Sequence, residues 1–413
     1  MKNAALVFCL LAALAAHPQS FTTAQYKEDF QWFWQTVNDN YCYFQKKKID
    51  WNRIREFYRP RIDTVTTRES FIALLEDALY ELYDHHCTLR TRNPFSRRLV
   101  PTGADIWAEW EGEKAVVREV RKGFGAGRVG IRAGMEIVAV DDVPVNQAIL
   151  PFLPHTVNRE SRSFALRLLM AGDHVHARKM TLKSGGATAD YYPDKDGLLL
   201  EDVQYPAWVE SASYGPIGYI RINNFLYDNN LIARFDSVLN GMLDKPALMI
   251  DLRETPSGGN TTVARAILGR FIRKDHFYQK HELYAEEKAT GVKRSWEEIV
   301  SPRGICYTGR VVVLADHWTG SIAEGITIAF DGMKRATVIG TELARLNGAV
   351  DGFELPVTKI GFNIATERLY HVDGTPRELF EPAITVDVRG QSAAKDGDVI
   401  LNTALGYLRR QLK

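Results

Sequence analysis

The stretch that decides the fold is residues 311–325, VVVLADHWTGSIAEG. Three valines and a leucine predict a short buried strand, and residues 322–330 have the apolar spacing of a helix. Ser321 falls at the elbow between them, where its hydroxyl would lie beside the free N–H groups that begin the helix. Such a serine suits attack on a carbonyl whose oxyanion needs a nearby stabiliser. The pattern Ser321-x-x-Glu324 is also a capping box, which is a purely structural interpretation.

Strand and helix patterns alternate on both sides of this elbow. Strands are predicted at 218–223, 247–252 and 337–339, and helices at 231–242 and 262–271. Such alternation is typical of a parallel sheet covered by helices. Residues 189–413 are therefore expected to form one α/β domain.

A second candidate segment is residues 251–260, DLRETPSGGN, which follow a predicted buried strand. In an open parallel sheet, ligands bind at the carboxyl ends of the strands. Gly258 and Gly259 could present backbone N–H groups to an oxyanion without a side chain in the way. The alternatives are a simple turn with a helix cap and a phosphate-binding loop, although neither Gly-Lys-Ser/Thr nor GxGxxG is present.

A nucleophilic serine needs a general base, and histidine is the usual one. His86 lies in residues 82–89, LYDHHCTL, after a helical stretch. His317, four residues before Ser321, is a rival base, and a lone histidine is more often structural than catalytic. No metal site is expected, because the adjacent histidines of LYDHHCTL lack zinc-ligand spacing and the chain has no HExxH.

The first half of the chain has a different character. Residues 21–98 show amphipathic helical spacing with many aromatic residues, which predicts a packed helical domain. Residues 99–188 alternate as strands around a glycine-rich stretch, and 131–145, IRAGMEIVAVDDVPV, resembles the hallmark of a PDZ domain. A PDZ domain binds an extended peptide, usually a C-terminus, by adding it to a sheet edge. The alternative is a small β-domain that has lost peptide binding.

Charge and targeting signals narrow the functional classes. The 413 residues carry 52 basic and 51 acidic side chains, for a net charge of +1, so electrostatics give no case for nucleic-acid binding. Residues 1–20 combine Lys2 with the apolar run AALVFCLLAALAA, which predicts a secretory signal too short to span a bilayer. We expect an exported protein, periplasmic or secreted, with no stable membrane span. Three cysteines would remain after cleavage, so at least one thiol stays free.

Together these segments are similar to the C-terminal processing (tail-specific) serine peptidases, a family that includes the tricorn core. The resemblance rests on the motifs LYDHHCTL, DLRETPSGGN and TGSIAEG and covers nearly all of the mature chain. It implies an α/β fold: a ClpP/crotonase-like catalytic domain with an N-terminal helical cap and an inserted PDZ-like β-domain. It implies no cofactor. Its partner would be a peptide or protein substrate, held by its C-terminus at the PDZ-like domain.

The resemblance also assigns roles within the elbow and the glycine motif. Ser321 would be the nucleophile. The oxyanion hole would be formed by the N–H of Ile322 with that of Gly258 or Gly259.

One branch of the family uses a lysine base about one strand after the serine. Here that position falls in residues 342–348, ELARLNG, where an arginine stands and no lysine is present. Arginine stays protonated and cannot act as a base. The tricorn-like branch uses the histidine that corresponds to His86, oriented by an acidic residue. Glu367 is the candidate for that acid, and Glu378 is the alternative.

The predicted function is an exported serine endopeptidase. It would cleave peptides or the C-terminal regions of proteins through a Ser–His acyl-enzyme mechanism. The alternative is a non-hydrolytic relative on the same fold that binds peptides or an apolar ligand, as retinoid-binding members of the family do. A third possibility is another acyl hydrolase, such as an esterase.

Overall fold

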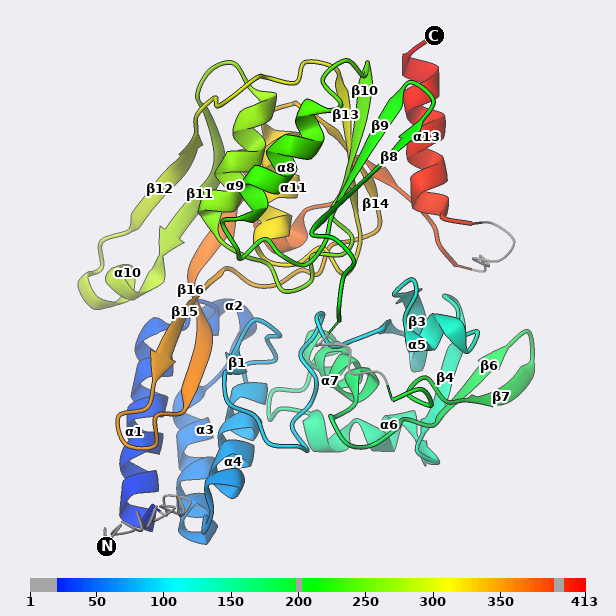
Figure 1. Cartoon of the computed structure of the whole chain (residues 1–413). Coiled ribbons are helices and arrows are strands. Elements are labelled where there is room, and N and C mark those ends of the chain that lie inside the picture. Colours follow the sequence, from blue (N-terminus) through cyan, green and yellow to red (C-terminus); the bar gives the residue numbers. More distant parts are fainter. Residues whose placement is uncertain (1–20, 198–202, 390–396) are drawn as a thin grey trace, which may run out of the picture.

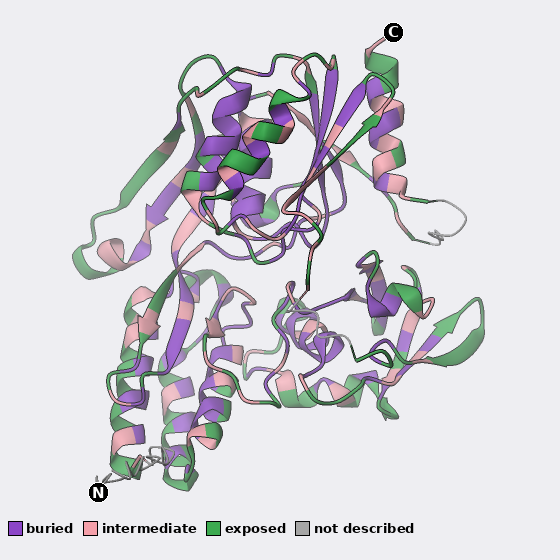
Figure 2. Ribbon diagram, viewed as in Figure 1, coloured by how far each residue is buried: buried purple, intermediate pink, exposed green. Residues whose placement is uncertain are grey.

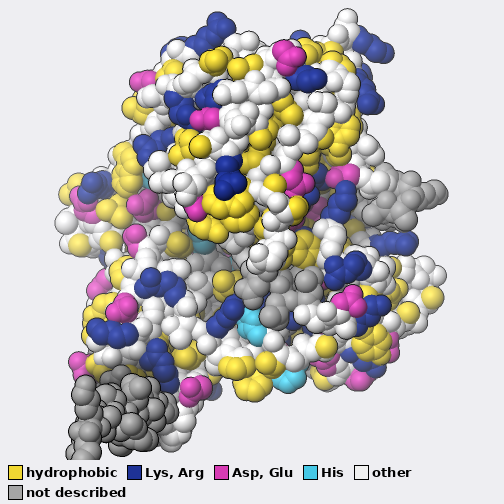
Figure 3. All heavy atoms as spheres, viewed as in Figure 1, with side chains coloured by type: hydrophobic (Ala, Val, Ile, Leu, Met, Phe, Trp, Pro, Cys, Tyr) yellow, Lys and Arg dark blue, Asp and Glu magenta, His cyan; other side chains and the backbone are white. Residues whose placement is uncertain are grey.

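The computed structural model describes residues 21–197, 203–389 and 397–413. The predicted signal segment, 1–20, lies outside the described residues. Along the chain, a helical unit is followed by a β-unit and then by a larger α/β unit (Figure 1). Within the described ranges, no helix has both the length and the apolar character needed to cross a membrane. Acidic and basic side chains are interspersed over the face in Figure 3, as the balanced composition leads one to expect.

The helical unit is built from α1 (Thr23–Asn40), α2 (Phe44–Lys47), α3 (Trp51–Tyr58) and α4 (Arg68–Tyr80). Side-chain caps start the longer helices: Thr22 accepts from the backbone of α1, and Thr67 from that of α4. The aromatic residues predicted to pack do so. Phe33 is fully buried, and its ring meets that of Phe362, in the strand β16 (Gly361–Tyr370), edge-on with centroids 5.1 Å apart. The helical unit is thus packed onto the rest of the molecule.

Asp29 on α1 joins this unit to the turn after β15 (Ala349–Glu354). Its buried carboxylate accepts from the backbone N–H groups of Val357, at 2.9 Å, and Thr358, at 2.7 Å. We expect Asp29→Ala to lower the free energy of unfolding by about 3 kcal/mol, because two backbone donors lose a charged acceptor. Chemical denaturation measures this. Asp39→Ala, on the exposed side of the same helix, is the control, and an equal loss there would contradict the assignment.

The β-unit is one sheet with helix α7 (Arg159–Ala171) packed beside it. Its strands, in order, are β2 (Ile106–Glu111), β3 (Lys114–Val120), β4 (Glu136–Val140), β6 (Met180–Ser184) and β7 (Ala187–Tyr191), with short β5 (Val143–Pro144) beside β4. β2 is an edge strand, and Trp110 near its end donates to the carbonyl of Arg162 on α7 at 3.0 Å. The last strand runs past the predicted boundary at residue 188, because β7 pairs with β6 as far as Tyr191.

The α/β unit has a second sheet, and its parallel core confirms the predicted alternation. Its strands, in order, are β17 (Ile384–Thr385), β14 (Thr337–Gly340), β13 (Arg310–Ala315), β10 (Ala247–Asp251), β9 (Ile217–Ile222) and β8 (Val209–Tyr214). All neighbours are parallel except β8 and β9. Every residue of β10 is buried, as the continuous apolar run predicts (Figure 2).

Helices cover both faces of this sheet. On one face lie α8 (Leu231–Asn240), α9 (Thr261–Leu268) and α11 (Ile322–Gly332), and on the other α13 (Val399–Gln411) (Figure 1). The central strands β10 and β13 pair in register, with Asp251 opposite Leu314. Their carboxyl ends therefore lie together, and the glycine motif and the serine elbow leave the sheet side by side.

A third sheet joins the helical unit to the α/β unit. It contains β1 (Thr88–Leu89), β16 (Gly361–Tyr370), β11 (His276–Leu283) and β12 (Arg294–Val300), with β15 paired to β16. Helix α10 (Tyr284–Thr290) connects β11 to β12. Residues 273–303 are thus mostly a hairpin in which β12 is largely exposed (Figure 2). β1 places the loop that carries His86 against β16.

Candidate active site

Ser321 occupies the elbow between β13 and α11 in an unusual backbone conformation. Its φ is 53° and its ψ is −113°, a region that residues with side chains rarely adopt. Its N–H donates to Glu324 Oε2 at 2.8 Å, which satisfies one backbone group at the start of the helix. The residue is half-buried, so its hydroxyl can be reached. This is the geometry of a nucleophile presented at a sharp turn.

The glycine motif lies directly against this serine. A methyl group at Gly258 would lie 2.4 Å from Ser321 Cβ, 2.9 Å from its Oγ and 3.3 Å from the backbone nitrogen of Ile322. Gly258 also has a φ of +69°, so both space and backbone require glycine. Gly259 instead faces the backbone of Leu226, 2.2 Å from the position a methyl would take. Gly258 thus faces the hydroxyl, and Gly259 supports the loop from behind.

Two backbone N–H groups near the elbow have no acceptor among the described residues: that of Ile322, directly after Ser321, and that of Gly259 in the glycine motif. The N–H of Gly258, by contrast, donates to Thr255 O at 3.3 Å. The same carbonyl accepts from Gly320 at 3.3 Å, so the two loops are joined. Free N–H groups next to a serine hydroxyl are what an oxyanion hole requires.

His86 is held by a backbone carbonyl. The ring Nδ1 of His86 lies 2.8 Å from Asn347 O, and the backbone N–H of His86 donates to Asp84 Oδ1 at 3.0 Å. Because a carbonyl can only accept, the proton lies on Nδ1 and the lone pair on Nε2. Burial lowers the pKa of His86 below its usual value, and the positive charge of Arg377 adds to this shift. The imidazole is therefore neutral at neutral pH and able to take up a proton.

One buried carboxylate connects the serine to the loop that holds this histidine. Glu324 Oε2 accepts from Ser321 and, at 3.3 Å, from the N–H of Leu346. Arg377 donates to the carbonyls of Leu346, at 3.0 Å, and Gly348, at 2.7 Å, and lies 3.7 Å from Glu324. The loop that offers Asn347 O to the imidazole is therefore fixed from both sides.

The structure does not bring Glu367 to His86, so the prediction that it orients the base is not supported. Glu367 Oε2 bonds instead to His281 Nδ1 at 2.8 Å, because pairing of β16 with β11 places the two residues together. The alternative, Glu378, forms an ion pair with Lys46 at 2.5 Å. The orienting group on Nδ1 is the carbonyl of Asn347.

The rival base His317 is also engaged elsewhere. Its Nδ1 lies 2.5 Å from Glu119 Oε2, and its ring stacks on Trp107 with centroids 4.7 Å apart. Among the described residues, no group of three or more His, Cys, Asp or Glu side chains is arranged to hold a metal ion. His86 is thus the histidine whose bonding suits a base.

Comparison with known proteins identifies the region around the elbow. Residues 216–389 match the model of peptidase family S41, and residues 22–79 match that of the Tricorn protease C1 domain. Residues 216–389 are thus similar to the S41 peptidases. This region contains Ser321 and Gly258, and the family supports a serine-type hydrolase. His86 lies between the two matched segments, so its assignment depends on the geometry above.

Other known proteins resemble this chain in sequence or in fold. The chain is 23% identical to Tricorn protease homolog 1 of Streptomyces coelicolor over 401 residues, covering 92% of this chain and 35% of that relative. The chain thus spans about a third of the relative's length. Mature CPAF has a similar fold (TM-score 0.63, 15% identity, covering 94% of this chain and 98% of that one). The photosystem II D1 C-terminal processing protease also has a similar fold (TM-score 0.56, 18% identity, covering 88% of this chain and 93% of that one).

The buried position of Glu324 in this candidate site predicts a pH dependence. Burial raises its pKa to about 7, against the opposing charge of Arg377. As the pH falls through 7, the carboxylate that accepts from Ser321 and Leu346 takes up a proton and holds both N–H groups less strongly. We expect kcat/KM to fall on the acid side with an apparent pKa near 7, and measurement over roughly pH 5 to 9 tests this.

The matched variant for this pH dependence is Glu324→Gln, which keeps an acceptor oxygen but cannot ionise. We expect the pH profile of kcat/KM for this variant to have a lower plateau and an acid limb with an apparent pKa below 6.5. The remaining acid limb would report His86, whose pKa is lowered from its ordinary value of 6.5. An acid limb that is identical in the two proteins would contradict the role given to Glu324.

Proposed function

We propose that this chain is a serine endopeptidase in which His86 activates Ser321 to attack a peptide carbonyl. The observation that carries the proposal is the approach of Gly258 to both the Ser321 hydroxyl and the backbone nitrogen of Ile322. A carbonyl attacked there would place its oxygen beside N–H groups at the start of α11. The N–H of Ile322, with that of Gly258 or Gly259, would stabilise the tetrahedral oxyanion.

In this mechanism, His86 Nε2 takes the hydroxyl proton as Ser321 Oγ bonds to the carbonyl carbon. The C–N bond then breaks, and the imidazolium gives its proton to the leaving amine. Water, activated by the same imidazole, hydrolyses the acyl-enzyme and regenerates the serine. The carbonyl of Asn347 keeps the proton on Nδ1 throughout, which is the orienting role an acidic residue was expected to fill.

The histidine-using, tricorn-like branch and a ClpP/crotonase-like catalytic domain belong to the same proposal. At the place where the other branch carries its lysine, Arg345 forms ion pairs with Glu381 and, at 3.3 Å, with Glu342. A guanidinium held between carboxylates cannot accept a proton. His86, whose Nδ1 is held by the carbonyl of Asn347, is the candidate base that remains.

The direct test is hydrolysis of a quenched fluorescent peptide library by the purified protein, compared with Ser321→Ala. We expect cleavage of internal peptide bonds by the wild type and none by the variant. Aryl esters run in parallel separate the other hydrolase class: turnover of esters alone would favour an esterase. No turnover of either substrate by a folded wild-type protein would favour the non-hydrolytic binder.

We further propose that the substrate is recognised by a free C-terminus at the β-unit, as a PDZ-like domain would do. β2 is the edge strand of that sheet and α7 packs beside it, the arrangement in which a peptide can be added as a strand. Two peptides that differ only in a C-terminal carboxylate or carboxamide test this. A lower KM is expected for the carboxylate, and equal values would refute recognition by the C-terminus.

Export is part of the proposal and depends on the sequence of residues 1–20. Expression of the full chain in a bacterial host, followed by fractionation and N-terminal sequencing, tests it. We expect a processed protein outside the cytoplasm that begins near residue 21. An unprocessed protein retained in the cytoplasm would contradict export.

A further inference from the structure

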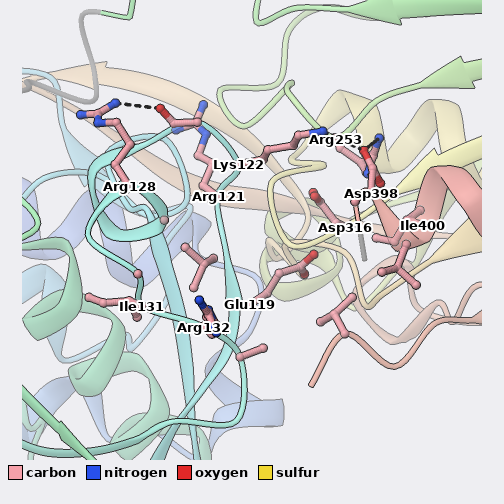
Figure 4. Close-up of a pocket in the computed structure, with 18 residues that line it drawn as sticks. Glu119, Arg121, Lys122, Arg128, Ile131, Arg132, Arg253, Asp316, Asp398 and Ile400 are labelled. Carbon is pink, nitrogen blue, oxygen red and sulfur yellow. Dashed lines mark hydrogen bonds and ion pairs between the residues drawn. The ribbon is translucent and has the colours of Figure 1, made fainter. Parts of the chain in front are cut away.

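The end of strand β3, in the β-unit, contacts both loops of the proposed active site. These are the serine loop, residues 316–321, and the glycine loop, residues 251–260. Glu119 is in β3, and Arg121 is the first residue after that strand. Because the two residues are two positions apart along an extended chain, their side chains point to the same side. Both are buried, at 7% and 2% exposure. Figure 4 shows them with Asp316 of the serine loop on the wall of a crevice of about 400 Å³ between the two units.

Glu119 holds the serine loop. Its Oε2 accepts from His317 Nδ1 at 2.5 Å and from the Thr341 hydroxyl at 2.7 Å. The His317 ring also stacks on the ring of Trp107 in β2. The next residue, Trp318, donates from its indole to the carbonyl of Ala104 at 2.8 Å. The segment immediately before Ser321 is therefore bound to the β-unit at two successive residues.

Arg121 holds the glycine loop. Its Nε donates to Glu254 Oε1 at 2.8 Å, and its Nη1 donates to the carbonyl of Thr102 at 2.8 Å. Glu254 is 4% exposed and also accepts from the Tyr205 hydroxyl at 3.0 Å. It stands four residues before Gly258. A guanidinium fork bound on two sides fixes direction as well as distance.

We propose that Glu119 and Arg121 are positioning residues that set the spacing between the Ser321 hydroxyl and the oxyanion-hole N–H groups. Each residue holds one of the two loops, and the two lie together at the end of β3, Glu119 in the strand and Arg121 just after it. Small displacements of catalytic groups cost large factors in rate, whereas substrate contacts far from these loops are unaffected. The inference rests on Ser321 being the nucleophile, and it assigns the β-unit a role in catalysis apart from any peptide binding.

The test compares kinetics and local exchange in point variants of the full chain. We expect Glu119→Ala and Arg121→Ala each to lower kcat by 10- to 100-fold with KM changed less than threefold. Glu119→Gln and Arg121→Lys should recover a large part of the loss, because each keeps one of the bonds. Glu111→Ala, which removes an exposed partner of Arg118 on the same sheet, is the control and should match the wild type.

Hydrogen exchange measured by mass spectrometry gives a readout that does not need activity. We expect faster exchange over residues 316–322 in Glu119→Ala and over 254–260 in Arg121→Ala, with the α13 peptides unchanged. Unchanged kcat and unchanged exchange would overturn the inference, and so would a loss confined to KM. If the alanine variants do not fold, Glu119→Gln and Arg121→Lys decide on the same criteria, with smaller expected changes. An inactive wild type with the expected exchange pattern would refute the peptidase and leave the loop contacts established.

Discussion

Replacing His86 with Gln should lower kcat/KM for peptide hydrolysis by roughly 10²–10⁴-fold, the usual contribution of a general base. Glutamine can still donate to Asn347 O from its amide, so the loop keeps its bond while the base is lost. The protein should fold normally and bind substrate with little change in KM. Steady-state kinetics with a fluorogenic peptide, together with a thermal melt, provide the measurement.

His281→Gln is the matched control for this prediction. His281 is the histidine bound to Glu367, and the orienting role first predicted for that acid would make the pair matter for catalysis. We expect nearly full activity, because neither residue bonds to His86. A drop in His281→Gln as large as that in His86→Gln would restore the Glu367 hypothesis.

Gly258→Ala should reduce kcat by roughly 10²-fold or more, because a shift of the glycine loop or of Ser321 misaligns the hydroxyl with the oxyanion-hole donors. The new methyl would meet Ser321 Cβ at 2.4 Å, closer than carbon atoms can approach, so either the serine or the loop has to move. A φ of +69° adds about 1–2 kcal/mol of backbone strain. Rate assays at saturating substrate and a denaturation curve separate the two effects.

Gly215→Ala isolates the strain from the clash. Gly215 has a φ of +67°, and nothing lies within 4 Å of the position of an added methyl. We therefore expect a similar loss of stability with kcat unchanged. If Gly258→Ala also kept its kcat, the loop would not form part of the oxyanion hole.

The elements that carry the site were predictable because their signals are local. The predicted strands at 247–252 and 311–315 correspond to β10 and β13, whose buried, continuous apolar runs are typical of a parallel core. The serine elbow and the glycine motif follow those strands directly. Once the strands are neighbours and parallel, the two motifs must meet, and the contact of Gly258 with Ser321 confirms this.

The partner of His86 could not be predicted from residue types. Asn347 contributes its backbone carbonyl from 261 residues away, and any residue can offer a carbonyl. Searching for an acidic side chain led instead to Glu367, whose direction is set by the pairing of β16 with β11. That pairing was itself hidden, because β11, HFYQKHEL, mixes charged and aromatic residues and has no clean apolar alternation.

The contacts between the β-unit and the catalytic loops were equally invisible in the sequence. His317 was noticed only as a rival base, and nothing near it in the chain indicated that Glu119, 198 residues earlier, would bind it. Buried pairs of this kind depend on how separately folded units dock. Local periodicity carries no information about docking.

Reaction with a fluorophosphonate followed by peptide mapping tests the central claim most directly. An activated serine beside an oxyanion hole forms a phosphonyl adduct through its Oγ, whereas ordinary serines do not react. We predict a single adduct on Ser321 in the folded wild type, and none in Ser321→Ala or in heat-denatured protein. An adduct that persists in Ser321→Ala, or maps to another residue, would contradict the assignment of Ser321 as the nucleophile.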